Sequence, residues 1–321
     1  MKRLIAIVVV IGSLVGGLLW LLQEEQGAGE EQLRVEGKLR VVTTTTMVTD
    51  MVKIIGGGRI GVQGLMGPGV DPHSYQITFN DTVALQQADI IFYSGLHLEG
   101  KMQDLLEKRA SKQGGVFAVT DGVAENLLLK PREEFQGYYD PHVWGDPKLW
   151  QRCIEVVVNA LCEADPAAAD DYKTRAKAYS EQLLELHLWA ERRMAEIPEE
   201  QRVLVTSHDA FLYFGEAFGI EVKGLQGVST NSESGLKDRA ELVAFIKSKQ
   251  LKSIFPESSV NAKGIRAVAE EAGVRVSEHE LFSDAMGQPG DLVTLHGETY
   301  DRGTYIGMIK HNVNTIVDGL K

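Results

Sequence analysis

The tripeptide Asp-Pro-His occurs twice in this chain, in "VDPHSYQ" around His73 and in "YYDPHVWGD" around His142. With only nine prolines and eight histidines in 321 residues, a chance repeat is improbable. Proline fixes its own φ and restrains the preceding residue to an extended conformation, so each loop is ordered before anything binds to it. The aspartate carboxylate can also accept backbone hydrogen bonds within the loop. Each copy is therefore predicted to hold one histidine in a fixed position.

Two further polar residues stand where strands are predicted to end. His208 closes the strand-like run in "LVTSHDAF", and Asp284 follows the last strand-like run in "HELFSDAMG". Ligands in open α/β sheets gather beyond the carboxyl ends of strands, where His73 also stands, and the loop of His142 can reach the same cleft. Neutral imidazoles and a carboxylate are good ligands for zinc or manganese. The candidate metal ligands are therefore His73, His142, His208 and Asp284.

Each of these residues also has a plainer explanation. A lone histidine in a strand-end loop is more often a polar surface residue, and Asp-Pro is a common turn pair, so spacing alone leaves a structural role open. Asp146 and Glu257 are candidates for supporting the ligands from behind, and Glu257 could equally be a surface charge. The other histidines are expected in lesser roles: His97 ordering the cleft or satisfying a backbone group, His187 facing solvent on a helix, His279 and His311 in structural contacts, and His296 in a polar loop.

Catalysis has little support in the sequence. The chain contains no Gly-x-Ser-x-Gly elbow, phosphate-binding loop, dinucleotide fingerprint or His-Glu-x-x-His motif. A catalytic zinc keeps one position open for water, whereas three histidines and an aspartate close a four-coordinate shell. A closed shell suits capture and carriage, so we expect a protein that is not an enzyme. A metal-dependent hydrolase and an adhesin with a structural metal remain as alternatives.

The charge balance bears on the kind of partner. The chain has 33 Lys and Arg against 45 Asp and Glu, a net charge of −12. Binding to a phosphate backbone needs clustered cations, so nucleic acid is not expected as a partner. A mild negative field would instead help a cation approach. Cys153 and Cys162 lie nine residues apart in a helix-like stretch, on opposite faces, and are not expected to form a disulfide.

The amino-terminal segment differs from the rest of the chain. Lys2 and Arg3 precede an uncharged apolar run of 19 residues, from Leu4 to Leu22, as in an export signal, and the run is also long enough to span a bilayer. No cysteine follows it directly. Residues 1–25 are therefore predicted to be a signal peptide or a membrane anchor, followed by a linker over 26–38. Either way the body of the protein is expected outside the cytoplasm, periplasmic or tethered to the outer face of the membrane.

The elements that must position the four ligands follow a βαβ pattern. Short β-branched runs alternate with helical patterns over 39–165 and again over 198–321, which predicts an α/β protein with two Rossmann-like lobes and mostly parallel sheets. Between them, apolar residues spaced by three or four predict one long helix over 166–197, with Asp165 as its N-cap and Pro198 as its stop. We expect this helix to brace the two lobes, with the metal in the cleft between them.

The chain resembles the cluster A-I (cluster 9) substrate-binding proteins of bacterial ABC transporters for zinc and manganese, and is most similar to the TroA-type members. The resemblance spans roughly Leu39 to Leu320. The segments that carry it are "DPHSYQIT", "YSGLHLEGKM", "DPHVWGDPKLW", "TSHDAFLYFGEAFGI", "GLQGVSTNSE", "IFPESS", "LFSDAMG" and "GTYIGMIKHNVNTIVDGL".

The resemblance implies two α/β lobes, a spanning helix, and a metal held by two ligands from each lobe. It carries the ligand roles onto His73, His142, His208 and Asp284. It also implies a permease with a cytoplasmic ATPase as partners, and we expect a monomer. The transported ion is expected to be Zn²⁺ or Mn²⁺, with Fe²⁺ less favoured. The region "AENLLLKPREEFQGYYD" has no histidine-rich loop of the zinc-dedicated kind, and His208 stands where manganese-dedicated members tend to have glutamate, so the metal is left open.

Overall fold

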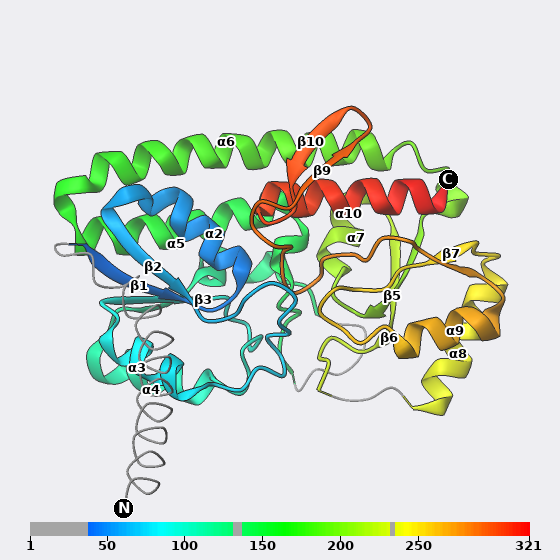
Figure 1. Ribbon diagram of the computed structural model, residues 1–321, viewed down its shortest axis with the longest axis horizontal. Helices are drawn as coiled ribbons and strands as arrows, with labels where there is room; N and C mark the ends of the chain where they lie inside the picture. The colour runs from blue at the N-terminus through cyan, green and yellow to red at the C-terminus, as the bar shows by residue number, and fades with distance from the viewer. Residues whose placement is uncertain (1–37, 131–136, 232–234) are drawn as a thin grey trace, which may run out of the picture.

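The computed structural model describes residues 38–130, 137–231 and 235–321. Residues 1–37 are outside this range, so the predicted signal peptide or anchor and nearly all of the predicted linker lie outside the described residues. Figure 1 shows two α/β lobes side by side, with the helix α6 (Ala169–Met194) running along one side of both and α10 (Tyr305–Leu320) lying beside it over the C-terminal lobe. The boundaries of the lobes at 39–165 and 198–321 stay a prediction.

The N-terminal lobe is built on a four-stranded parallel sheet in the order β2-β1-β3-β4. Its strands are β1 (Leu39–Thr43), β2 (Ile60–Gly64), β3 (Ile90–Tyr93) and β4 (Val116–Ala118). Its helices are α2 (Thr46–Gly56), α3 (Phe79–Gln87), α4 (Gln103–Gln113) and α5 (Pro147–Ala164). Because the sheet is covered on both faces, β3 reads as an unbroken apolar run, IIFY, rather than an alternation of apolar and polar residues, whereas β1 and β2 also contain Arg40 and Gln63.

The C-terminal lobe repeats this arrangement with two strands of six residues and two of only two residues. Its parallel strands are β5 (Val203–His208), β6 (Glu221–Gln226), β7 (Ser253–Ile254) and β8 (Arg275–Val276). β5 pairs with β6 and β7 with β8, and the Phe255 N–H donates to the Val205 carbonyl, which places β7 beside β5. The helices are α7 (Leu212–Phe218), α8 (Leu236–Ser248), α9 (Lys263–Ala272) and α10. The predicted α/β class with mostly parallel sheets is confirmed.

An antiparallel hairpin is an addition to the predicted elements. β9 (Leu292–Leu295) and β10 (Glu298–Asp301) are joined by a two-residue turn. Both turn residues, His296 and Gly297, have positive φ values of 51° and 80°. Such a turn matches the right-handed twist of the flanking strands. His296 is therefore a turn residue, and its ring pairs with Asp318 on α10.

The helix α6 is the predicted brace between the lobes. All seven positions that set its predicted apolar face are buried: Tyr172, Ala176, Tyr179, Leu183, Leu186, Ala190 and Met194. The predicted cap is wrong, because a 3-10 turn over Pro166–Ala168 precedes the helix and Asp165 instead accepts hydrogen bonds from Arg59 and Tyr172. Among the described residues, no helix is both long and apolar enough to cross a membrane.

The largest hydrophobic core runs through both lobes. It contains Val41 of the first sheet, Trp150 of α5, Leu183 of α6, Leu204 of β5 and Ile316 of α10. Two smaller cores fill the opposite faces of the sheets, one beneath α3 and α4 and one beneath α8 and α9. Cys153 and Cys162 are free, as predicted. Since the main core has no break at the cleft, the lobes are packed against each other rather than merely linked.

Candidate metal centre

Three histidines and one aspartate from four separate segments meet between the lobes. His73 follows β2, His142 precedes α5, His208 is the last residue of β5, and Asp284 lies in the loop after β8. One ligand atom from each lies within 4.8 Å of the others, and all four side chains are buried. The structure therefore brings together the four residues that the sequence singled out. It is the one such group among the described residues.

The distances between these side chains match those around a small metal ion. The Nε2 atoms of His73 and His142 are 3.3 Å apart. Asp284 Oδ1 lies 3.3 Å from His142 Nε2, and Asp284 Oδ2 lies 3.2 Å from His208 Nε2. Four atoms placed tetrahedrally at about 2.1 Å from a zinc ion are about 3.4 Å from one another. His208 Nε2 and Asp284 Oδ1 are buried without a hydrogen-bond partner, as expected of atoms arranged to meet a cation.

The two Asp-Pro-His loops are ordered as predicted. Asp71 Oδ1 accepts the His73 N–H at 2.9 Å, and Asp140 Oδ1 accepts the His142 N–H at 2.8 Å. Asp140 has a second contact that the sequence did not reveal, because its Oδ1 also lies 2.9 Å from His142 Nδ1. A proton on Nδ1 leaves Nε2 free to bind a metal. Asp140 therefore fixes both the position and the tautomer of His142.

Glu257 supports His208 from behind, which is the first of its two predicted roles. Its Oε1 accepts the His208 N–H at 2.8 Å, and its Oε2 lies 2.5 Å from His208 Nδ1. Both Glu257 and His208 are buried. A carboxylate on the second ring nitrogen of a ligand histidine fixes the ring and increases its basicity. The alternative, a strand-end surface charge, is wrong because Glu257 is only 1% exposed.

Asp146 and His187 contact each other rather than the four grouped residues. Asp146 Oδ1 accepts the Lys148 N–H at the start of α5 and lies 3.0 Å from His187 Nδ1. The prediction that His187 faces solvent is wrong, since it is 2% exposed and packs on Phe218 with ring centroids 5.2 Å apart. Leu183 and Ala190, four residues before it and three after it on α6, lie on the buried face, so the apolar spacing of the helix could have revealed the burial of His187.

The remaining histidines lie outside the group of four. His97 stacks on Tyr138 with ring centroids 4.1 Å apart. His311 Nε2 is 3.0 Å from the Glu280 carbonyl, a structural contact as predicted. His279 is exposed and lies edge-on to His311 with ring centroids 6.0 Å apart.

Burial and neighbouring charges set the protonation of the centre. Burial lowers the pKa of His73 to about 3, so this imidazole is neutral. Burial also acts to lower the pKa of His142, but Asp140 and Asp284 outweigh it and raise the pKa to about 9. Burial is likewise outweighed at His208 by Glu257 and Asp284, which raise its pKa, and at Asp284 by His208 and His142, which lower its pKa. Protons on His142 and His208 thus offset part of the negative charge of the buried carboxylates Asp140, Glu257 and Asp284 until a cation replaces them.

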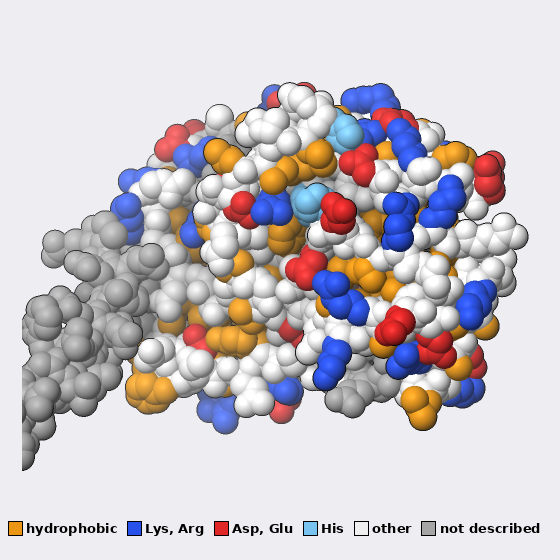
Figure 2. Space-filling model, turned by 45° about the vertical axis from the view of Figure 1, so that its right-hand side comes forward, with side chains coloured by type: hydrophobic (Ala, Val, Ile, Leu, Met, Phe, Trp, Pro, Cys, Tyr) orange, Lys and Arg blue, Asp and Glu red, His pale blue; other side chains and the backbone are white. Residues whose placement is uncertain are grey.

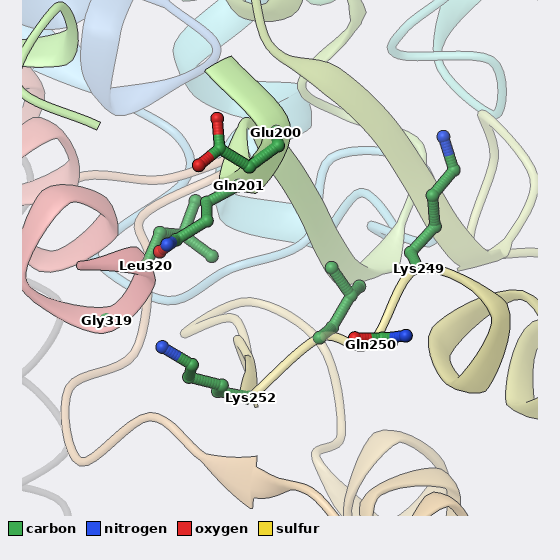
Figure 3. Close-up of a pocket in the computed structure, with 8 residues that line it drawn as sticks. Glu200, Gln201, Lys249, Gln250, Lys252, Gly319 and Leu320 are labelled. Carbon is green, nitrogen blue, oxygen red and sulfur yellow. The ribbon is translucent and has the colours of Figure 1, made fainter. Parts of the chain in front are cut away.

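Among the described residues, no second group of three or more His, Cys, Asp or Glu side chains converges closely enough to hold a metal ion. A pocket of about 290 Å³ in the C-terminal lobe, drawn in Figure 3, is lined by Lys249, Lys252 and Glu200 among others and contains no histidine or cysteine. On the face shown in Figure 2, lysines and arginines are interspersed with acidic side chains rather than gathered into a basic stripe. The buried group between the lobes is therefore the site that the chemistry favours.

Comparison with known proteins gives the family. A family model described as "ZnuA: Zinc-uptake complex component A periplasmic" matches residues 41–319. The manganese-binding lipoprotein MntA of Bacillus subtilis is 44% identical over 290 residues, which cover 88% of this chain and 90% of MntA. The zinc-binding protein TroA of Treponema pallidum is 41% identical over 326 residues, which cover 99% of this chain and 98% of TroA.

Solved structures agree with this result. The structure of TroA from Treponema pallidum matches with a TM-score of 0.82 and 42% identity, covering 88% of this chain and 99% of TroA. The laminin-binding protein Lmb of Streptococcus agalactiae matches with a TM-score of 0.73 and 26% identity, covering 88% of this chain and 100% of Lmb. The resemblance inferred from the motifs is confirmed. The chain belongs to the ZnuA family, the periplasmic component A of zinc-uptake complexes.

Proposed function

We propose that this chain is the extracytoplasmic substrate-binding protein of an ABC transporter, capturing Zn²⁺ or Mn²⁺ between its lobes and delivering the ion to a membrane permease. The ligands are His73, His142, His208 and Asp284. The observation that carries the proposal is the convergence of four buried ligand atoms within 4.8 Å of one another in a chain of this family. Relatives that bind zinc and manganese by name support the choice of cargo.

Elemental analysis and metal titration test the proposal. Protein purified without added metal should contain zinc or manganese, or should bind one equivalent when titrated with either ion. The His208→Ala variant should bind far more weakly, because it removes one of the four ligands and leaves Glu257 Oε2 buried without the ring that it contacts. A wild-type protein that neither contains nor takes up a transition metal would refute the proposal, and unchanged affinity in His208→Ala would remove that residue from the site.

The protein is proposed to act as a carrier and not as an enzyme. The Asp284 carboxylate lies against both His142 and His208. Together with three imidazoles it would leave little room for a reactive water on a bound ion. A metal-dependent hydrolase with the same ligands would turn over ester or phosphate substrates. Assays of the zinc-loaded and manganese-loaded protein with nitrophenyl esters and nitrophenyl phosphates distinguish the two functions, and metal-dependent turnover would favour the hydrolase.

The choice between the two metals depends on opposite features of the site. Three nitrogen ligands favour zinc by intrinsic affinity. Asp284 presents one oxygen to His142 and the other to His208, so both oxygens can reach the ion, which suits the higher coordination number of manganese. We propose zinc as the tighter ligand and manganese as a physiological competitor. Competition titrations with both ions, together with the metal content of protein from cells grown in balanced zinc and manganese, test this order.

We propose a monomer that works in the periplasm or tethered to the outer face of the cell membrane, with a permease and its cytoplasmic ATPase as partners. Adhesion is a second candidate function, supported by the similarity to Lmb, whose structure is described as that of a bifunctional protein with adhesin and metal-transporting activity. In an adhesin with a structural metal, a chelator would remove the ion only with unfolding. Laminin binding before and after chelation, followed with circular dichroism, separates this role from transport.

A further inference from the structure

His73 is held differently from the other two histidines of the centre. His142 Nδ1 lies 2.9 Å from Asp140, and His208 Nδ1 lies 2.5 Å from Glu257. No carboxylate on the His73 Nδ1 is found among the contacts of residues 38–130, 137–231 and 235–321. His73 is fixed instead through its backbone: its N–H donates to Asp71 and its carbonyl accepts a hydrogen bond at 2.9 Å from Asn231 of the other lobe.

Asn231 belongs to a small set of hydrogen bonds that joins the two lobes beside the metal centre. Thr230 Oγ1 donates to Asp71 Oδ2 at 2.6 Å, and Asn231 Nδ2 donates to the His73 carbonyl. Ser74 Oγ donates to the same Asp71 oxygen at 2.7 Å. We call the two bonds made by Thr230 and Asn231 the interlobe clasp. Both of its acceptors lie in the first Asp-Pro-His segment, one of them on a candidate ligand itself.

The clasp lies away from the helix that braces the lobes. The segment of Asp71 and His73 leads into α3, and the segment of Thr230 and Asn231 leads into α8. Figure 1 shows α3 and α8 on the side of the molecule opposite α6, one below each lobe. The lobes are therefore joined at two places, by α6 and the shared core on one side and by the clasp on the other.

The clasp is also the more exposed of the polar contacts between the lobes. Trp144 Nε1 donates to the Ser283 carbonyl at 2.7 Å, and the Tyr305 hydroxyl donates to the Trp144 carbonyl at 2.7 Å, both fully buried. By contrast, Asn231 is exposed and Thr230 is half-buried. Hydrogen bonds near solvent exchange with water at little cost, so they open before buried ones do.

The two copies of Asp-Pro-His thus use their aspartates in different ways. Asp140 is fully buried, and its Oδ1 contacts both the backbone N–H and the ring Nδ1 of His142. Asp71 uses one oxygen for the His73 backbone and presents the other to Thr230 of the opposite lobe. The first copy is therefore tied to the other lobe through partly exposed side-chain bonds. The second is held by its own aspartate and by the buried Tyr213 hydroxyl of the other lobe, which donates to the Asp140 carbonyl.

We propose that Thr230 and Asn231 are positioning residues that hold His73 in the metal centre and set the rate at which the metal leaves. This inference rests on the proposed metal-binding function. When the clasp is closed, the His73 loop is fixed at its N–H, its carboxylate and its carbonyl. When it opens, His73 is the ligand released first, because within the described ranges its ring lacks the carboxylate partner that the rings of His142 and His208 have, while the other three ligands stay in place.

Stopped-flow measurement of zinc release tests the clasp. Wild type, Thr230→Val, Asn231→Ala and the double variant are loaded with zinc and mixed with an excess of a chromogenic chelator. Loss of one neutral hydrogen bond changes an equilibrium or rate constant by about fivefold. We therefore expect zinc to dissociate about fivefold faster from Asn231→Ala than from wild type. The bond from Thr230 to a carboxylate is charge-assisted, so Thr230→Val should release zinc about tenfold faster or more.

A matched threonine on the hairpin provides the control. Thr294 Oγ1 lies 2.8 Å from Thr299 Oγ1 within one lobe, so Thr294→Val removes a hydroxyl hydrogen bond without touching the cleft. It should release zinc at the wild-type rate. Two readouts separate positioning from general destabilisation: the clasp variants should keep the melting temperature of the metal-free protein and the visible spectrum of the Co²⁺-loaded protein, which reports the ligand set.

The outcomes are distinct. Faster release in both clasp variants, with the spectrum and the metal-free melting temperature unchanged, supports the proposal. Wild-type release rates in Thr230→Val and Asn231→Ala, or equal acceleration in Thr294→Val, would overturn it and leave the proposed function intact. Failure of the wild-type protein to bind Zn²⁺, Mn²⁺ or Co²⁺ would overturn the proposed function itself.

Discussion

Glu257 offers the sharpest test of how the protein supports its metal ligands. Both groups that face its carboxylate are donors, namely the His208 N–H at 2.8 Å and His208 Nδ1 at 2.5 Å. A carboxylate can accept from both, whereas the amide of Glu257→Gln has one acceptor oxygen and one NH₂ group. The substitution keeps the size of the side chain but sets one buried donor of His208 against another donor.

The expected loss follows from that geometry. An unsatisfied buried donor costs about 1–3 kcal/mol, and loss of the partner of a ligand histidine typically lowers metal affinity by about 10- to 100-fold. Glu257→Gln should therefore raise the zinc dissociation constant by about tenfold to a hundredfold. A competition titration against a chromogenic zinc chelator measures it, with urea unfolding of the metal-free protein to record any loss of stability.

A surface pair of the same chemistry serves as the control. His296 Nε2 lies 2.9 Å from Asp318 Oδ2, and both side chains are more than two-fifths exposed, at 46% and 43%. Exposed ion pairs contribute little, so Asp318→Asn should leave zinc affinity within about twofold of wild type. Wild-type zinc affinity in Glu257→Gln would refute this role of Glu257, since the carboxylate on the ring would then contribute nothing to metal binding.

Three further predictions follow from the contacts described above. Zinc affinity should fall as pH falls below about 9, because the raised pKa of His142 means that its proton must leave when the metal binds. Calorimetric titration in buffers of different ionisation enthalpy counts the protons released on binding. Zinc binding without proton release would contradict this prediction. The metal-free protein should lose stability as pH rises from 6.5 through about 9, because the pKa of His142 is raised in the folded state and its ring stabilises the fold only while it is protonated. Urea unfolding at a series of pH values measures this, and a free energy of unfolding that does not change with pH would refute the prediction. Trp150→Ala should lower the free energy of unfolding by about 3–5 kcal/mol, because Trp150 is fully buried and stacks on Tyr305; urea denaturation measures it, and a loss well below that range would contradict the packing.

The sequence predicted the elements that carry a local signature. The apolar spacing along α6 defines one buried face, and the proline-bracketed loops hold His73 and His142 as their composition indicates. His208 and Asp284 could be grouped with them because ligands gather beyond the carboxyl ends of the strands in open α/β sheets, and the two lobes were expected to share one site between them. These inferences needed no knowledge of which side chains meet in three dimensions.

The remaining features depend on contacts between distant segments. His187 packs on Phe218 and pairs with Asp146, which are far from it in the chain, and only its place beside Leu183 and Ala190 on the buried face of α6 signals the burial locally. Asp165 could not be assigned as a cap or as the partner of Arg59 from its position before a proline alone. The split between the roles of Asp71 and Asp140 is likewise invisible in two identical tripeptides.

The continuous core bears on whether a permease can distinguish the metal-loaded protein from the empty one. Val41, Leu183, Leu204 and Ile316 belong to one apolar cluster, and separating the lobes like a clamshell would expose it to water. Loading and unloading are therefore expected to change the heat capacity and the radius of gyration very little. The protein then presents nearly the same surface to a permease with and without a bound ion. Metal-free copies of the protein are therefore expected to compete with metal-loaded copies for binding to the permease. Uptake would then be governed by the ratio of loaded to empty receptor, which makes the abundance of this protein a control on the transport rate.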